Sequence, residues 1–291
     1  MQRFKAFVLL GKPFITIAVS ISALSGYLLY SGEFSKGWLP LFTGIFLLAY
    51  SSACLNQLQE RTIDARMART RKRPLPSGKL TPSEALAAIL ITAPAGALLL
   101  WLAGDLPALA LGLSNLILYN LLYTRLKPHT LFAVLPGSLV GAIPPVIGWI
   151  SAGGPIPHLH ILMVAMFFFI GQIPHTWLIL LRYNDEYEDA GFISLGKLFN
   201  RQQINALTFT WVTCTAIAAV MLSIAGVFFL KTTSIINMIL ALALLVYFGT
   251  WLRNDRHKAI GQAFTVLNMV YLCVMMMLII DSLARHDFTV Y

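Results

Sequence analysis

Long apolar runs follow one another along almost the whole chain. We count nine, at roughly 14–31, 38–55, 85–102, 106–123, 131–150, 161–181, 205–230, 232–251 and 263–280. Each is close to the ~20 residues that an α-helix needs to cross a bilayer. Backbone groups in hydrocarbon must be hydrogen-bonded within the protein, so each run is expected to be helical. The sequence therefore predicts an all-α polytopic membrane protein with about nine transmembrane helices, folded as a single domain over residues 1–291.

The composition agrees with this class. The chain of 291 residues is 58% hydrophobic and only 11% charged, which is far too apolar for a soluble globular protein. We expect no cleavable signal peptide, because no convincing small-residue cleavage site follows the first apolar run. The net charge of +9 is explained by loops that face anionic lipid, and it does not require a nucleic-acid partner.

The basic residues assign a side to each loop. With nine spans, the N-terminus and the loops after spans two, four, six and eight share one side. Of the 21 lysines and arginines, the other side holds only Lys36, Lys231 and Arg285. Basic loops stay in the cytoplasm, so the sequence predicts a cytoplasmic N-terminus and cytoplasmic active-site loops. The expected location is a bacterial inner membrane.

A row of oxygen-bearing side chains marks the end of the second span. Asn56, Glu60 and Asp64 are four residues apart, so on a helix they point along one face. Hard oxygen donors suit Mg²⁺, which proteins usually hold with one or two carboxylates plus substrate phosphates. This row is the strongest functional signal in the sequence.

A basic segment follows the acidic row directly. It contains Arg66, Arg69, Arg71, Lys72 and Arg73, and then Pro74 and Pro76 interrupt the helix. Guanidinium and ammonium groups are the donors that an oligophosphate requires. Membrane topology alone is the alternative explanation, but it does not account for so many cations in one loop beside carboxylates.

A second acidic segment follows span six, on the same side of the membrane. Asp185 and Asp189 are again four apart, with Glu186 and Glu188 beside them. Two carboxylate rows at the cytoplasmic ends of two helices could clamp Mg²⁺ and a diphosphate between them. The alternative is a solvated loop. We favour the functional interpretation because acidic residues at the ends of spans are costly.

Several motifs of the chain resemble those of a known family. The pattern Asn56-x3-Glu60-x3-Asp64, followed by MARTRKRPLPSG, is similar to the first motif of the UbiA superfamily of intramembrane prenyltransferases. The stretches YTRLKPHT (123–130), GAIPPVIGW (141–149), IPHTW (173–177) and YEDAG (187–191) resemble the protoheme IX farnesyltransferases, or haem O synthases. The likeness covers about residues 8–195.

Several positions depart from the family pattern. The family usually has aspartate where this chain has Glu60, Thr62 and Glu186. Its usual arginine after Lys12-Pro13 is Phe14 here, and its Pro-Met-Leu-Pro stretch is replaced by Ile193-Ser194-Leu195.

The resemblance implies nine transmembrane helices around a central cavity and a prenyltransferase activity. Such an enzyme would transfer a farnesyl group from farnesyl diphosphate to protohaem IX (haem B), forming haem O and diphosphate. Its cofactor would be Mg²⁺. It would lie in membrane lipid and could have a haem A synthase or another membrane protein as its partner. We interpret Asn56, Glu60, Asp64, Asp185 and Asp189 as catalytic metal ligands. We interpret Arg69, Arg73 and Lys127 as the primary hydrogen-bond donors to the diphosphate. Arg66, Lys72 and Arg125 are secondary candidates for the same role.

His175 is unusual because it lies inside span six. A histidine within the membrane requires a partner. It matches the histidine of the family's motif, which makes it a candidate haem ligand or acceptor-orienting group. A structural hydrogen bond between helices is the alternative.

The sequence is also compatible with other functions. One is a UbiA-type prenyltransferase that acts on an aromatic quinone precursor or another lipid-soluble acceptor. Another is a non-catalytic haem-binding relative. A transporter should carry its ionisable groups near the bilayer midplane, whereas here the acids gather at one membrane face.

Overall fold

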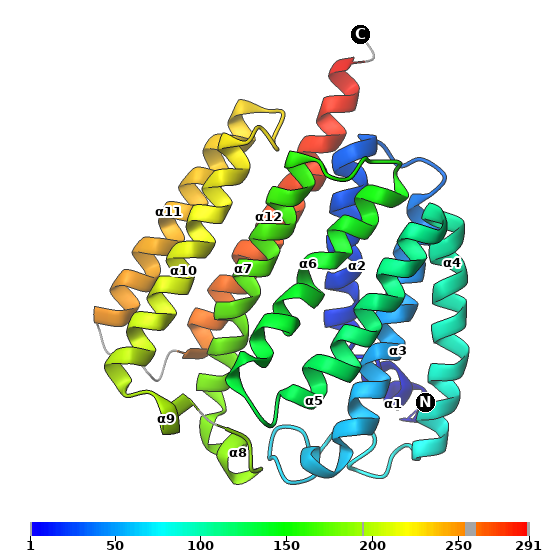
Figure 1. The fold of residues 1–291 in the computed structure, drawn as a ribbon, viewed down its shortest axis with the longest axis vertical. Helices are drawn as coiled ribbons and strands as arrows, with labels where there is room; N and C mark the ends of the chain where they lie inside the picture. Colours follow the sequence, from blue (N-terminus) through cyan, green and yellow to red (C-terminus); the bar gives the residue numbers. More distant parts are fainter. Residues whose placement is uncertain (1, 194, 254–259, 290–291) are drawn as a thin grey trace.

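The computed structural model describes residues 2–193, 195–253 and 260–289, which form helices and short connections without a strand. The helices are α1 (Gln2–Leu10), α2 (Pro13–Ser31), α3 (Trp38–Asp64), α4 (Pro82–Ile117), the π-helix η1 (Leu118–Tyr123), α5 (Thr124–Leu126), the 3-10 helix η2 (Leu131–Ala133), α6 (Val134–Ser151), α7 (Leu159–Arg182), α8 (Asn184–Asp189), α9 (Leu195–Leu198), α10 (Arg201–Ile224), α11 (Lys231–Arg253) and α12 (Ile260–Thr289). The long helices stand side by side as one bundle (Figure 1). This arrangement confirms the all-α membrane class.

Eight helices in the described part of the chain are long and apolar enough to span a membrane. One of them covers Pro82–Leu126, 45 residues, which as a straight helix would be about 68 Å long and so over twice the ~30 Å hydrocarbon core. The backbone is not helical at Gly104 and Asp105, and Leu100 packs against Gly112 across the break. The chain therefore reverses there, between the predicted spans 85–102 and 106–123. Pro82–Leu126 thus supplies two crossing segments, which makes nine in the described part of the chain.

The seventh predicted span is wrong at its C-terminal end. The prediction ran to residue 230, but α10 ends at Ile224. Gly226 has a φ of 68°, which ends the helical course. The backbone N–H groups of Phe229 and Leu230 then donate to the carboxylate of Asp281 on α12, at 2.6 and 3.0 Å. The apolar residues 225–230 form a connection that hydropathy alone cannot distinguish from helix.

Side-chain caps fix the starts of two spanning helices. Thr81 accepts from the backbone N–H of Glu84, and the Glu84 carboxylate accepts from the N–H of Thr81 at 2.8 Å. Asn200 and Gln203 form the same reciprocal pair before α10, both at 2.9 Å. These capping boxes satisfy N–H groups that have no partner within the helix.

Helices α2 and α6 pack unusually closely. A Cβ on Gly148 would lie 1.8 Å from the carbonyl oxygen of Ala23, and one on Gly26 would lie 1.9 Å from that of Pro145. Pro144 and Pro145 remove backbone donors, yet α6 continues through both and buries them. Small residues thus allow the backbones to touch, and the prolines do not end the helix.

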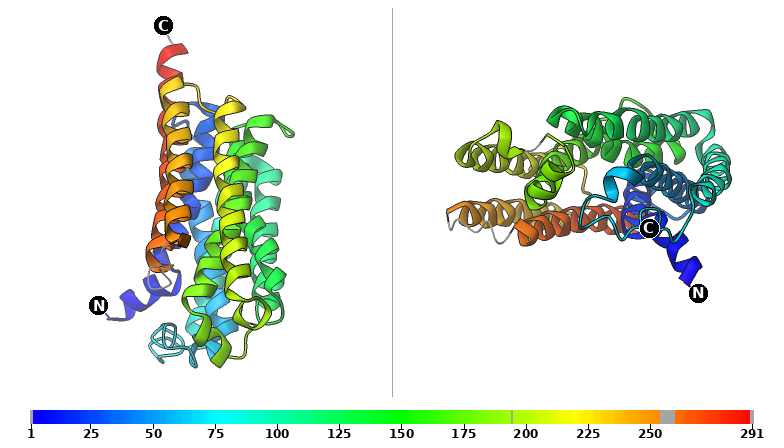
Figure 2. Two further views of the ribbon diagram at one scale, coloured as in Figure 1. Left: turned by 90° about the vertical axis from the view of Figure 1, so that its left-hand side faces the viewer. Right: turned by 90° about the horizontal axis from the view of Figure 1, so that it is seen from below.

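The basic segments gather at one end of the bundle. Helix α1, the segment between α3 and α4, α5, α8 and α9 lie there, and the C-terminal part of α12 lies at the other end (Figure 1). Arg256 and Lys258 of the predicted basic loop after span eight lie outside the described residues. Helix α1 projects sideways from this end, and α4 lies at the edge opposite α10 and α11 (Figure 2).

Candidate active site

The last turns of α3 carry the predicted oxygen row in buried positions. Asn56, Glu60 and Asp64 are 2%, 7% and 3% exposed. They lie along one face of the helix, as their spacing of four predicts. Polar groups buried at the end of a span are costly unless they are paired, so their partners decide what the site is.

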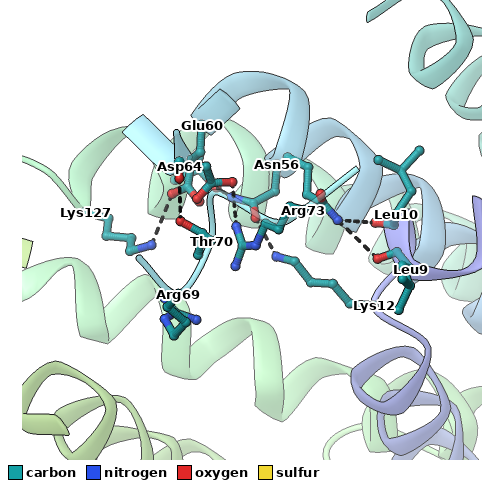
Figure 3. A network of polar contacts seen from close by, with 12 residues as sticks. Leu9, Leu10, Lys12, Asn56, Glu60, Asp64, Arg69, Thr70, Arg73 and Lys127 are labelled. Carbon is teal, nitrogen blue, oxygen red and sulfur yellow. Dashed lines mark hydrogen bonds and ion pairs between the residues drawn. The ribbon is translucent and has the colours of Figure 1, made fainter. Parts of the chain in front are cut away.

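Each member of the row is bonded to a different cation. The ammonium of Lys127 lies 3.1 Å from Oε1 of Glu60, and Nη1 of Arg73 lies 2.6 Å from Oδ2 of Asp64. Nζ of Lys12 donates to Oδ1 of Asn56 at 2.7 Å. Figure 3 shows the three cations converging on α3 from separate segments. Two of the predicted donors, Arg73 and Lys127, therefore meet the row.

Parallel packing of two segments brings Lys127 to Glu60. Asn120 donates to Ser52 Oγ at 2.6 Å, and Asn56 donates through Nδ2 to Thr124 Oγ1 at 3.3 Å. The Lys127–Glu60 pair continues this series. The paired residues are 68, 68 and 67 positions apart. A nearly constant offset is the geometry of two parallel helices in register, so one packing arrangement fixes all three pairs.

The second of these segments includes the π-helix η1. A π-helix leaves backbone groups without their usual helical partners and is frequent at functional sites. Gln59 Nε2 donates to the carbonyl of Asn120 at 3.2 Å, and Thr124 Oγ1 donates to that of Tyr119 at 2.8 Å. Side chains of the site thus satisfy the backbone of the turn that positions Asn120, Thr124 and Lys127.

The segment after α3 folds back so that Arg73 reaches Asp64. Thr70 Oγ1 donates to the backbone carbonyl of Asp64 at 2.9 Å. Leu75 and Leu80 are buried in a small apolar cluster with Leu10 of α1 and Cys54 of α3. These contacts hold the segment on both sides of Arg73, which gives its guanidinium a fixed position.

Arg69 connects this segment to α8. Its backbone N–H donates to Oε2 of Glu186 at 3.0 Å, and its guanidinium carbon lies 4.7 Å from the ring centroid of Tyr183. Met67 is buried in one cluster with Tyr187 of α8. The segments that carry the two predicted acidic rows are therefore in contact. Arg69, predicted to bind diphosphate, contacts the second segment here.

The remaining predicted residues lie further from the row. Asp185 and Asp189 are exposed on α8, and Oδ1 of Asp185 accepts a long 3.4 Å bond from its neighbour Asn184. Among the acids of this segment, Glu186 contacts the segment after α3, because its carboxylate accepts a hydrogen bond from the backbone N–H of Arg69. The three secondary diphosphate candidates Arg66, Lys72 and Arg125 are exposed.

His175 lies between α7 and α12. Its ring centroid is 4.9 Å from that of Phe264. Its Nδ1 is buried and has no hydrogen-bond partner among the residues that the structure describes. A side-chain hydrogen bond joins His175 to Asn268 of α12, so the second interpretation of this residue, a hydrogen bond between helices, is supported, and only Nδ1 is left without a partner among the described residues.

Sequence reasoning missed Lys12 as a site residue and counted it only toward membrane topology. Burial, and then the positive charge of Arg73, lower the pKa of Lys12 from 10.5 to about 7. Burial alone would also lower the pKa of Lys127, but the carboxylate of Glu60 raises it above the ordinary value. The available signal for Lys12 was its position directly before Pro13 at the start of a span.

The donor set suits a Mg²⁺ ion that is shared with a phosphate ligand. Asn56, Glu60 and Asp64 offer hard oxygens on one face. Among the described residues, no three Asp, Glu, His or Cys side chains could hold an ion by themselves. An ion here would use the amide of Asn56 and oxygens of the ligand, which is the usual manner for Mg²⁺.

Comparison with known proteins identifies the family. The UbiA prenyltransferase family matches residues 3–274. The chain is 33% identical over 266 residues to a protoheme IX farnesyltransferase of Oleidesulfovibrio alaskensis, covering 91% of this chain and 92% of that protein. It is 39% identical over 185 residues to one of Geobacter sulfurreducens, covering 63% and 68%.

Solved structures share the fold. A digeranylgeranylglyceryl phosphate synthase superposes with a TM-score of 0.78 at 17% identity, covering 98% of this chain and 100% of that one. A UbiA homologue from Archaeoglobus fulgidus bound to GPP and Mg²⁺ superposes with a TM-score of 0.70 at 13% identity, covering 94% and 99%. The buried carboxylate row, the bundle of apolar spanning helices and the sequence match agree: this chain belongs to the UbiA prenyltransferase family.

Proposed function

We propose that the chain transfers a farnesyl group from farnesyl diphosphate to protohaem IX, forming haem O and releasing diphosphate. The observation that supports this most is the charge of the site. Lys12, Arg73 and Lys127 gather around the carboxylates of Glu60 and Asp64 and the neutral amide of Asn56. A buried surplus of positive charge is stabilised by an anion, and a diphosphate supplies one. The protoheme IX farnesyltransferases of similar sequence support the acceptor.

The proposed reaction begins at the bond between the prenyl carbon and the diphosphate oxygen. This bond breaks and the diphosphate leaves with the electron pair, so charge develops where the cations converge. A vinyl group of protohaem then bonds to the prenyl carbon. Water adds to the resulting haem-side cation and loses a proton, which leaves a hydroxyethylfarnesyl substituent.

Mg²⁺ is the proposed cofactor, and when bound it would neutralise charge on the diphosphate. Asn56, Glu60 and Asp64 would hold it from α3. Asp185 and Asp189 of α8 are proposed as ligands from the second segment, because that segment contacts the first through Arg69 and Glu186. Arg69, Arg73 and Lys127 are the proposed diphosphate donors.

We infer that the end of the bundle with this site faces the cytoplasm of a bacterial cell, in the inner membrane. Helix α1 and the described basic segments at this end support the orientation. His175 is proposed to contact the acceptor, and a haem A synthase or another membrane protein to receive the product.

The test is a product assay with purified protein. We expect haem B, farnesyl diphosphate and Mg²⁺ to yield a prenylated haem detected by mass, together with released diphosphate. Product with 4-hydroxybenzoate and none with haem would replace the acceptor with an aromatic quinone precursor. Haem binding without diphosphate release from any acceptor mixture would indicate a non-catalytic relative.

A further inference from the structure

Lys12 occupies the junction between α1 and α2, and its backbone is held in an uncommon conformation. Its φ and ψ are 50° and 63°, in the left-handed region, which few residues other than glycine adopt. Pro13 begins α2 directly after it. The Lys12 carbonyl accepts from the backbone N–H of Ile15 at 3.0 Å and of Thr16 at 3.1 Å. The turn is thus held on its α2 side by the first turn of that helix.

The α1 side of the same turn is held by α3. Gln57 is 1% exposed, and its Nε2 donates to the carbonyls of Leu10 at 2.7 Å and Leu9 at 3.3 Å. Tyr50, two turns earlier on α3, donates to the carbonyl of Phe7 at 2.8 Å. Carbonyls in the last turn of a helix lack intrahelical partners, so these bonds fix the end of α1. Gln57, which anchors α1, directly follows Asn56 in the chain, and Asn56 is the residue that Lys12 contacts.

The partner of Lys12 differs in kind from those of the other two cations. Lys127 and Arg73 are each paired with a carboxylate. Lys12 donates to the neutral amide oxygen of Asn56. Figure 3 shows its extended side chain entering the same cluster. In its ammonium form, Lys12 therefore carries a charge that none of the ion pairs described in this cluster compensates.

We propose that Lys12 binds the diphosphate of the prenyl substrate, as a third cation beside Arg73 and Lys127, and that Gln57 is the residue that positions it. The proposal rests on the proposed prenyl transfer. The Lys12 ammonium is buried among carboxylates and cations, and its turn is held on both sides. It is therefore preorganised for an anion and loses little conformational freedom when the anion binds. Ammonium groups bind phosphate oxygens through charge-assisted hydrogen bonds.

The experiment is a calorimetric titration of inorganic pyrophosphate with Mg²⁺ into the full-length protein in nanodiscs. We expect Lys12→Met to weaken pyrophosphate binding about tenfold to a hundredfold, the usual effect of one charge-assisted bond. Lys12→Arg should restore most of the affinity. Lys5→Met is the matched control, since Lys5 is an exposed cation on α1, and it should bind as the unsubstituted protein does.

Gln57 is tested by a double-mutant cycle. If Gln57→Leu acts by releasing the turn that holds Lys12, it should weaken pyrophosphate binding on its own but add little in a Lys12→Met background. Full additivity would overturn the positioning role. Thermal unfolding of each variant establishes that it is folded. If Lys12→Met does not fold, Lys12→Gln replaces it in the cycle.

The outcomes separate the two proposals. Unchanged pyrophosphate affinity in Lys12→Met, with prenyl transfer intact in the unsubstituted protein, would overturn the role of Lys12 and leave the function standing. Failure of the unsubstituted protein to bind pyrophosphate or prenyl diphosphate would overturn the proposed function, and the role of Lys12 with it.

Discussion

The ammonium of Lys127 lies 3.1 Å from a carboxylate oxygen of Glu60, although the two residues are 67 positions apart in the chain. The pair closes a series of contacts between two parallel segments that also includes Asn120 with Ser52 and Asn56 with Thr124. A break of that register would separate the cation from the acid row. The series thus links the packing of the membrane helices to the geometry of the site.

Among the three residues of the row, substitution of Asp64 should reduce the catalytic rate most. It is buried and paired with Arg73 at 2.6 Å. We expect Asp64→Ala to slow diphosphate release by about 10²- to 10³-fold, because electrostatic stabilisation at the departing group is lost. Quantification of released diphosphate measures this. Haem binding, followed by its visible absorption, should stay mostly intact. Normal turnover would show that the metal assignment is wrong.

A Mg²⁺ titration tests whether the exposed acids of α8 are metal ligands. If Asp185 and Asp189 are Mg²⁺ ligands, Asp185→Asn and Asp189→Asn should each raise the Mg²⁺ concentration needed for half-maximal rate, by about tenfold for one lost charged ligand. Asp105→Asn is the matched control, since Asp105 is an exposed acid in the turn that interrupts α4. A Mg²⁺ dependence that is unchanged in both variants would remove α8 from the ligand set.

His175 should be examined by spectroscopy. If it ligates haem iron, His175→Ala should change the visible spectrum of bound haem and weaken haem binding about tenfold or more. Truncation of a ring that packs against Phe264 should also lower stability by roughly 1–3 kcal/mol. His175→Phe keeps an aromatic ring at the contact and separates the two effects. An unaltered haem spectrum in both variants would leave only the packing role.

The contact between α2 and α6 makes a prediction about stability. A methyl group at Gly148 would meet backbone atoms of α2, with the carbonyl oxygen of Ala23 only 1.8 Å away. Gly148→Ala should therefore destabilise the protein by about 1–3 kcal/mol. Gly249→Ala is the control, because nothing lies within 4 Å of that position, and alanine is the better helix former. Thermal unfolding in detergent compares them, and equal midpoints would contradict the close packing.

The sequence was a good guide where a local rule applied. The spacing of four placed Asn56, Glu60 and Asp64 on one helix face, and the structure has them there. The turn at Gly104 was also predictable, since glycine and proline interrupt a run too long for one crossing. The end of α10 was not, because residues 225–230 are apolar and their backbone is bonded by Asp281, which is distant in sequence.

By itself the sequence determined the class of protein, the approximate number of crossings and the acidic row, because hydropathy, charge bias and helical periodicity act over a few neighbouring residues. Only the tertiary structure decided which cation meets which oxygen. Lys12 reaches Asn56, Lys127 reaches Glu60, and Arg69 contacts α8. The physical reason is that these partners are set by the register and close packing of helices far apart in the chain, which no local pattern encodes.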